Sequence, residues 1–196
     1  GALGALDVSD DGNIIAIGAL YEDSGAVGAT DTTSTTSSGS NNSKTDAGAA
    51  YIFTRSGTSW AQTAYIKASN TGAGDNFGKL SLSGDGDTLV VSAFNEDSKL
   101  SEDDSYPAIS NTLAEWSAAD NNDLGGSGSG AVYVFVYDAS DSTWEQKAFI
   151  KASNAQAEDG FGGDGDELEE SLVISKDGLT IAVSAGGEDS AATGIN

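Results

Sequence analysis

The sequence contains no cysteine, no methionine and no histidine, and it has a single proline. Without cysteine the chain forms no disulfide and has no thiol nucleophile, and without histidine it lacks the base of the common nucleophilic triads. The same absences remove the usual ligands of zinc and copper. Paired carboxylates are the remaining catalytic groups, so we expect the protein not to be an enzyme.

Positive charge is also scarce, because 8 lysine and arginine residues stand against 31 aspartates and glutamates, for a net charge of −23. A chain this acidic is repelled by nucleic acid and by anionic membrane surfaces, so we expect neither as a partner. No apolar run approaches the roughly 18 residues that a membrane helix needs, so we expect no membrane insertion. The Gly, Ser, Thr, Asn and Asp bias favours an extracellular or cell-surface protein.

What the sequence does contain is an internal repeat, which sets the fold more strongly than any local pattern. Ile66–Asn70 returns as Ile150–Asn154, and Trp60 returns as Trp144, each 84 residues later. The tripeptide Glu-Asp-Ser occurs three times in the same register, beginning at Glu22, Glu96 and Glu188. A motif that recurs in every unit favours a role in the scaffold, because a catalytic site normally occurs once.

The repeat divides the chain into units 1–76, 77–160 and 161–196, the last of them incomplete. In the second unit four segments are rich in β-branched and aromatic residues and are bounded by turn residues, which is typical of strands. They are Lys79–Ser83, Thr88–Ala93, Ala131–Tyr137 and Trp144–Ala152. The second is apolar or small throughout and the third is apolar on both faces, so both faces of each sheet should be covered. The sequence therefore predicts an all-β fold of four-stranded antiparallel β-propeller blades, in the form of a partial propeller.

The order of the motifs identifies a family. Phe77-Gly78 is followed by Leu-Ser-Gly-Asp-Gly-Asp-Thr-Leu-Val-Val-Ser-Ala, by Glu-Asp-Ser and by Gly-Ala-Val-Tyr-Val-Phe. This arrangement resembles the FG-GAP repeat of integrin-α-type β-propellers, in its secreted form, and it covers nearly the whole chain. Two features depart from the family: Ala93-Phe94 stands in place of Ala-Pro, and the loop that binds calcium in some members is here a short hairpin.

Several acidic residues are candidate calcium ligands. An Asp-Gly turn links the first two strands of each unit at Asp11, Asp85 and Asp177, with Asp87 beside the second, and the segment after Phe161 adds Asp164 and Asp166. Asp-Gly also closes a hairpin with no ligand, and a solvated acidic loop needs none either. Because calcium takes six to eight oxygen ligands, one aspartate per turn is not sufficient without neighbours. Both interpretations remain open on the sequence alone.

Long insertions separate the second and third strands, at about 24–47 and 98–129. The second insertion carries Tyr106 and Trp116, which either pack locally on the blade or form an exposed contact surface. Trp60 and Trp144 begin the fourth strand of their units and are expected to pack between blades, and the repeated Lys67 and Lys151 are expected to pair with carboxylates.

The resemblance implies an extracellular module of adhesion or ligand binding, belonging to a larger protein, whose insertions contact a protein or glycan. The alternative is a structural subunit of a filament or matrix, in which blades stack between copies of the chain. A closed propeller has about four to eight blades. Two complete units and part of a third therefore leave sheet faces for the rest of a propeller, or for further copies, to cover.

Overall fold

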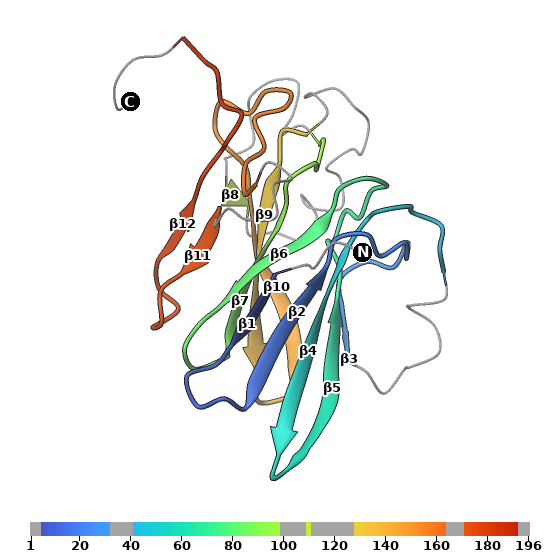
Figure 1. Cartoon of the computed structure of the whole chain (residues 1–196), viewed down its shortest axis with the longest axis vertical. Helices are drawn as coiled ribbons and strands as arrows, with labels where there is room; N and C mark the ends of the chain where they lie inside the picture. The colour runs from blue at the N-terminus through green and yellow to red at the C-terminus, as the bar shows by residue number, and fades with distance from the viewer. Residues whose placement is uncertain (1–4, 32–40, 99–108, 111–127, 164–170, 192–196) are drawn as a thin grey trace.

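The computed structural model describes residues 5–31, 41–98, 109–110, 128–163 and 171–191. Every regular element among them is a β-strand, and the strands form three antiparallel sheets that lie side by side in chain order (Figure 1). The predicted all-β class is therefore confirmed, and the first two sheets contain the four antiparallel strands expected of propeller blades. No helix in the described part of the chain is long and apolar enough to span a bilayer.

The first two sheets share one strand order. In the first blade the order is β1, β2, β4, β5 and β3, with bounds Leu6–Val8, Ile14–Ala19, Ala49–Ser56, Ser59–Ile66 and Ala29–Asp31. In the second blade it is β6, β7, β9, β10 and β8, with bounds Phe77–Leu82, Thr88–Ala93, Ala131–Asp138, Thr143–Ile150 and Ile109–Ser110. The third sheet pairs β11 (Leu172–Ile174) with β12 (Ile181–Val183).

Each complete blade has one strand more than the repeat pattern predicts. The short β3 and β8 come from the two insertions and pair antiparallel with the outer strand of their own blade. Ala29 lies opposite Ile66, and Ile109 lies opposite Ile150, which is the same position in the repeat. These strands are only two or three residues long, which is why no periodicity in the sequence marks them.

The cores lie between blades because the strands are apolar on both faces. In β9, Tyr133 and Phe135 join a core cluster shared with the first blade, while Val132 joins a second cluster with Leu172 and Ile174 of the third sheet. All of these side chains are buried. The prediction that both faces of the second blade are covered is therefore confirmed. The blade is held by close packing against both of its neighbours.

Neighbouring blades meet at Phe77 and Phe161, the first residues of their units. Each lies beside the residues that precede β4 or β9 in the unit before it. Phe77 donates its backbone N–H to Ala47 O at 3.0 Å, and Phe161 does the same to Ser129 O at 3.0 Å. A Cβ added to Gly48 would lie 2.0 Å from Phe77 O, and one added to Gly130 would lie 2.4 Å from the backbone of Phe161. Both glycines also have positive φ, so no other residue fits the two junctions.

The first blade leaves one apolar face uncovered. Leu6 is 71% exposed, whereas Leu80, at the equivalent position of the second blade, is 7% exposed against the first. The prediction that both tryptophans pack between blades is correct for Trp144, which is buried, and wrong for Trp60, which is 43% exposed. Trp60 lies on the uncovered face, and the guanidinium of Arg55 stacks over its ring. The burial of a repeated residue thus depends on whether a blade covers it.

Candidate functional site

The turns between the first two strands of each unit meet at one end of the structure (Figure 1). Asp10 donates its backbone N–H to Gly84 O at 2.8 Å, and Gly84 donates to Lys176 O at 2.9 Å, so three turns from three units are joined in a chain. Lys176 Nζ also lies 2.7 Å from Asp10 Oδ1. The candidate calcium residues of the three turns are thus brought to the same end.

Within each turn the aspartate accepts hydrogen bonds from its own hairpin. Asp85 accepts from Ser83 Oγ at 2.5 Å and from the N–H of Asp87 at 3.1 Å. Asp11 and Asp177 make the same pair of contacts with the serine two residues before and the N–H two residues after. These bonds, the serine bond first, lower the pKa of all three carboxyl groups below the ordinary value, because they favour the ionised form.

The geometry of these turns is explained without a cation. Calcium takes six to eight oxygens, yet the described residues contain no group of three or more acidic, histidine or cysteine side chains arranged to hold a metal. Calcium ligation by Asp11, Asp85, Asp87 and Asp177 stays a prediction. Asp164 and Asp166, and the loop residues Tyr106 and Trp116, lie outside the described residues.

The Glu-Asp-Ser loops gather at the opposite end of the blades, where buried lysine and glutamate side chains form ion pairs. Lys151 Nζ lies 2.5 Å from Glu96 Oε2, and both side chains are almost completely buried. In the first blade Lys67 Nζ lies 2.9 Å from Glu22 Oε2. The expected pairing of the repeated lysines with carboxylates is confirmed. Burial lowers the pKa of Lys67, and the Glu22 carboxylate opposes that shift.

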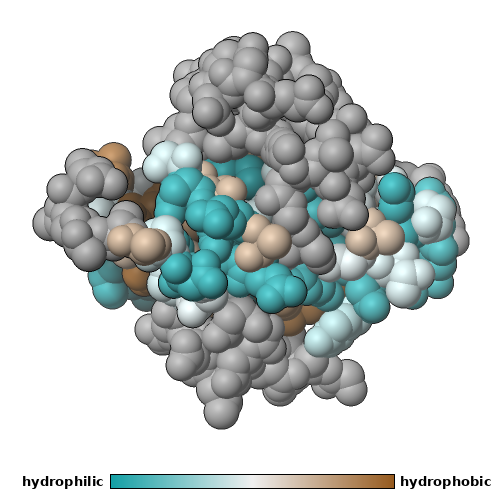
Figure 2. All heavy atoms as spheres, turned by 90° about the horizontal axis from the view of Figure 1, so that it is seen from above, coloured by the Kyte–Doolittle hydropathy of each residue, from teal (hydrophilic) through white to brown (hydrophobic). Residues whose placement is uncertain are grey.

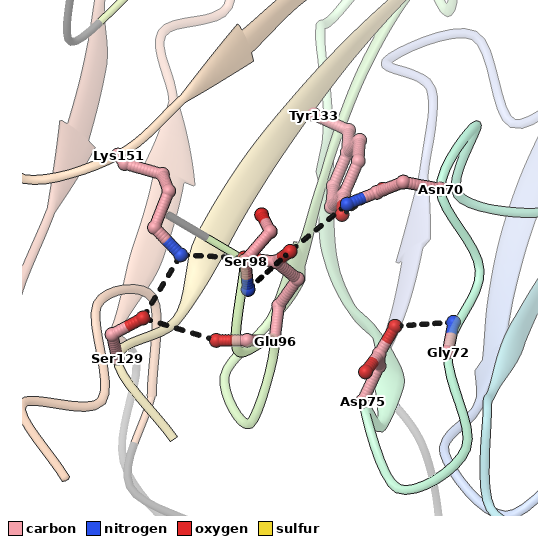
Figure 3. A network of polar contacts seen from close by, with 8 residues as sticks. All are labelled: Asn70, Gly72, Asp75, Glu96, Ser98, Ser129, Tyr133 and Lys151. Carbon is pink, nitrogen blue, oxygen red and sulfur yellow. Dashed lines mark hydrogen bonds and ion pairs between the residues drawn. The ribbon is translucent and has the colours of Figure 1, made fainter. Parts of the chain in front are cut away.

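The Glu-Asp-Ser glutamates of the second and third units, Glu96 and Glu188, link their own unit to the one before it. Asn70, at the end of the first unit, donates its side-chain amide to Glu96 Oε1 at 2.9 Å (Figure 3). Asn154 makes the equivalent contact with Glu188 Oε1 at 3.3 Å. Glu96 also accepts from the N–H of Ser98 at 3.0 Å, so the triplet caps its own loop, which agrees with the scaffold role predicted from its recurrence. Both carboxylate oxygens of Glu96 therefore have donors, as a buried charge requires.

A second buried carboxylate lies beside this network. Asp75 is nearly inaccessible and accepts a hydrogen bond from the N–H of Gly72 at 2.6 Å (Figure 3). Burial, and then the negative charge of Glu96, raise the pKa of Asp75 to about 7, although the Gly72 N–H and the Lys151 charge act in the opposite direction. The sequence analysis missed Asp75, although this aspartate returns as Asp159 in the next unit, and Asp159 is also buried.

The insertions leave and rejoin the blades at this network. Gly130, at the return of the second insertion, donates its N–H to Glu96 O at 3.0 Å, and Ser129 Oγ donates to the same oxygen at 3.2 Å. Gly48 donates to Glu22 O at 2.8 Å at the return of the first insertion. The two ends of each insertion are thus fixed to one residue. On the face seen from above, the described residues are mostly hydrophilic, with apolar residues between them (Figure 2).

Comparison with protein-family models gave a match to the FG-GAP repeat model over residues 60–106. The chain carries an FG-GAP repeat. The matched segment runs from the outer strand β5 across the blade junction to β7 and the Glu-Asp-Ser loop, which are the elements that the repeated contacts join. The repeat indicates an integrin-like module of β-propeller type. Searches among curated proteins and solved structures gave no match.

A cavity of about 370 Å³ opens at the junction between the second blade and the third sheet. Its walls come from the loop after β7, the return of the second insertion, the start of the third unit and the loop after β12. The lining residues are Phe94, Asn95, Gly128, Glu158, Gly160, Gly163, Gly186 and Gly187. Sequence reasoning missed this cavity, although the signal was present as glycines at repeat positions that carry side chains in the preceding unit.

Proposed function

We propose that the chain is an extracellular or cell-surface ligand-binding module of adhesive type, and that it belongs to a larger β-propeller protein. FG-GAP repeats typically occur in extracellular or surface proteins, and FG-GAP domains bind protein ligands. The observation that carries the proposal is the fixing of both insertions to the same repeated glutamate at one end of the blades. Loops that vary in sequence on a rigid repeated scaffold are where repeat proteins bind their partners.

The insertions provide the first test. Replacing residues 111–127 with a Gly-Ser linker keeps β8 and the return at Gly128, so we expect the melting temperature to change little. Binding to a panel of immobilised extracellular-matrix proteins and glycans, measured by surface plasmon resonance, should fall by at least tenfold for any ligand that the intact chain retains. Replacing residues 32–40 tests the first insertion in the same way. The proposal fails if no panel member binds, or if both variants bind as well as the intact chain does.

A second candidate function, a structural subunit in which blades stack between copies, is favoured by the uncovered face of the first blade. Ile17 is 39% exposed there, whereas the equivalent Val91 is 0% exposed in the second blade. Leu6 and Val8 extend the same apolar face along β1. The face of the second blade that carries Leu80 packs on the first blade, so the matching face of the first blade suits a further blade from the same protein or another copy.

Sedimentation velocity tests the stacking candidate. Stacking predicts that the weight-average mass rises above 19.7 kDa with protein concentration, and that Leu6→Asp suppresses the rise. Val27→Asp is the matched control, because Val27 is also exposed but lies in the first insertion. A concentration-independent monomer, or equal association by both variants, would rule out stacking through this face.

A further inference from the structure

The cavity at the junction of the second and third units has a filled counterpart at the junction of the first two. The repeat offsets relate the two junctions residue by residue. Five positions that carry side chains at the first junction are glycine at the second: Asp46, Asn76, Lys79, Phe94 and Asn95 correspond to Gly128, Gly160, Gly163, Gly186 and Gly187. All five glycines line the cavity. The cavity thus occupies the volume that this chain's own side chains fill one repeat earlier.

At the filled junction a carboxamide occupies the centre of that volume. Asn76 Nδ2 donates to Leu20 O at 3.2 Å, and Asn76 Oδ1 accepts from Asn95 Nδ2 at 2.7 Å. Beside this pair, Lys79 Nζ lies 5.6 Å from the centroid of the Phe94 ring. The first junction therefore shows which chemical groups the shared backbone frame accepts.

At the open junction the side-chain donor of the first junction is missing. Phe94 O is the counterpart of Leu20 O, and Gly160, which stands in place of Asn76, has no side-chain amide to donate to it. Asp159 is not itself a lining residue, but it lies in sequence between Glu158 and Gly160, which are; it is 1% exposed, and its Oδ1 has no hydrogen-bond partner in the described part of the chain. Asn95 Oδ1 also faces this region, 3.4 Å from where a Cβ on Gly128 would lie. Buried acceptors without donors are costly unless a ligand or water satisfies them.

At one lining position the change between the two junctions runs the other way, from glycine to a residue with a side chain. Glu158 replaces Gly74 of the first junction, although the position has a left-handed backbone, with φ of 84° at Gly74 and 67° at Glu158. A glutamate at such a φ is strained, and strain of this kind is concentrated at functional sites. The exposed Glu158 side chain adds another acceptor to the wall of the cavity.

We propose that this cavity binds the carboxamide of an asparagine or glutamine side chain from a protein partner. The backbone around the cavity is the counterpart of the backbone that holds the Asn76 amide. It presents hydrogen-bond acceptors such as Phe94 O, which match the two N–H donors of a carboxamide. The cavity volume of about 370 Å³ leaves room for the neighbouring backbone of the partner. The inference rests on the proposed ligand-binding function but not on the insertions.

The test uses N-acetyl-asparagine methylamide as the probe and NMR amide shifts of the lining glycines as the readout, with the full chain. We expect saturable shifts at Gly160 and Gly186, and no such shifts with N-acetyl-aspartate methylamide. Gly160→Asn should abolish them, because its own amide then donates to Phe94 O. The variant should fold, since Gly160 has φ of 61° and Asn76 has φ of 54°. It should also raise the melting temperature.

The reciprocal variant keeps the proposal falsifiable if Gly160→Asn fails to fold. Asn76→Gly should open a second site, doubling the number of probe molecules bound and lowering the melting temperature. The Gly-Ser replacement of residues 111–127 should leave probe binding unchanged, which separates this site from the insertion surface. Absence of saturable shifts in the intact chain, or unchanged shifts in Gly160→Asn, would overturn the proposal. Tighter binding of N-acetyl-arginine methylamide would overturn the proposal that the cavity binds a carboxamide, and would indicate a site for a cationic side chain at Glu158 instead.

Discussion

Replacing Lys151 by methionine is expected to lower the free energy of unfolding by about 3–5 kcal/mol. The lysine side chain is buried 2.5 Å from the buried Glu96 carboxylate, and it also donates to Ser129 Oγ at 2.9 Å. Methionine preserves most of the side-chain length but leaves Glu96 as an uncompensated charge beside Asp75. The cost of that unpaired buried charge, rather than the strength of the ion pair itself, is the origin of the expected loss.

Urea denaturation followed by tryptophan fluorescence measures the effect, and two further variants interpret it. Lys147→Met removes the exposed pair with Glu145 on the same strand and should change the midpoint little, because water screens that pair. The double variant Glu96→Gln with Lys151→Met should recover part of the loss, since neither charge is then buried alone. Equal destabilisation by Lys147→Met and Lys151→Met would contradict the burial of the pair.

Asp75→Asn is expected to stabilise the protein at pH 8, by on the order of 4 kcal/mol if the whole shift of the Asp75 pKa is relieved. The pKa is raised from 3.8 to about 7 by burial first and by the charge of Glu96 second. Asparagine keeps an oxygen that accepts from the N–H of Gly72, so the loop contact is retained. The substitution removes only the buried negative charge.

The same shift gives the pH dependence a definite sign. Between pH 3.8 and about 7 the folded protein holds a proton on Asp75 that the unfolded chain releases. Stability therefore falls as the pH rises through this window and becomes level above it. Melting temperatures of the natural chain should be higher at pH 5.5 than at pH 8, and Asp75→Asn should flatten the difference. A natural chain whose melting temperature is unchanged or lower at pH 5.5 would show that Asp75 titrates normally.

The exposed turn aspartates act in a different range. Because the pKa values of Asp11, Asp85 and Asp177 are lowered, their contribution is present above pH 3.8 and is lost only as the pH falls through the folded values. The two groups of carboxylates therefore separate in a pH titration. Measurements at pH 5.5 and above report Asp75 without interference from Asp11, Asp85 and Asp177.

The fold was predictable because the repeat reports contacts that recur in space. Gly48 and Gly130, Phe77 and Phe161 return in register since each pair forms the same blade junction. Strands β7 and β9 also show their burial directly in the sequence, because a strand that is apolar on both faces must be covered on both faces. The two-residue strand β8 leaves no such pattern, so the fifth strand of the blade could not be predicted.

The candidate site was less predictable, because its features depend on which blade covers which residue. Trp60 and Trp144 occupy one repeat position, yet only Trp144 is buried, since the second blade has a neighbour on that side. The partner of Glu96 from the preceding unit, Asn70, is 26 residues earlier and belongs to a different repeated motif, Ile66–Asn70, so the sequence does not show that the two side chains meet. The sequence indicates the cavity only at positions where the repeats differ, whereas the prediction of the fold used the positions where the repeats agree.

Native-state hydrogen exchange at the blade junctions tests the central claim most directly, which is that repeated backbone contacts join the three units into one cooperative structure. The amides of Phe77 and Phe161 donate across blades, to Ala47 O and Ser129 O. The account predicts that both exchange as slowly as the amide of Val90 at the centre of β7, because they open only when the blades separate. Rapid exchange at Phe77 and Phe161, with Val90 still protected, would contradict it and show that each blade is stable alone.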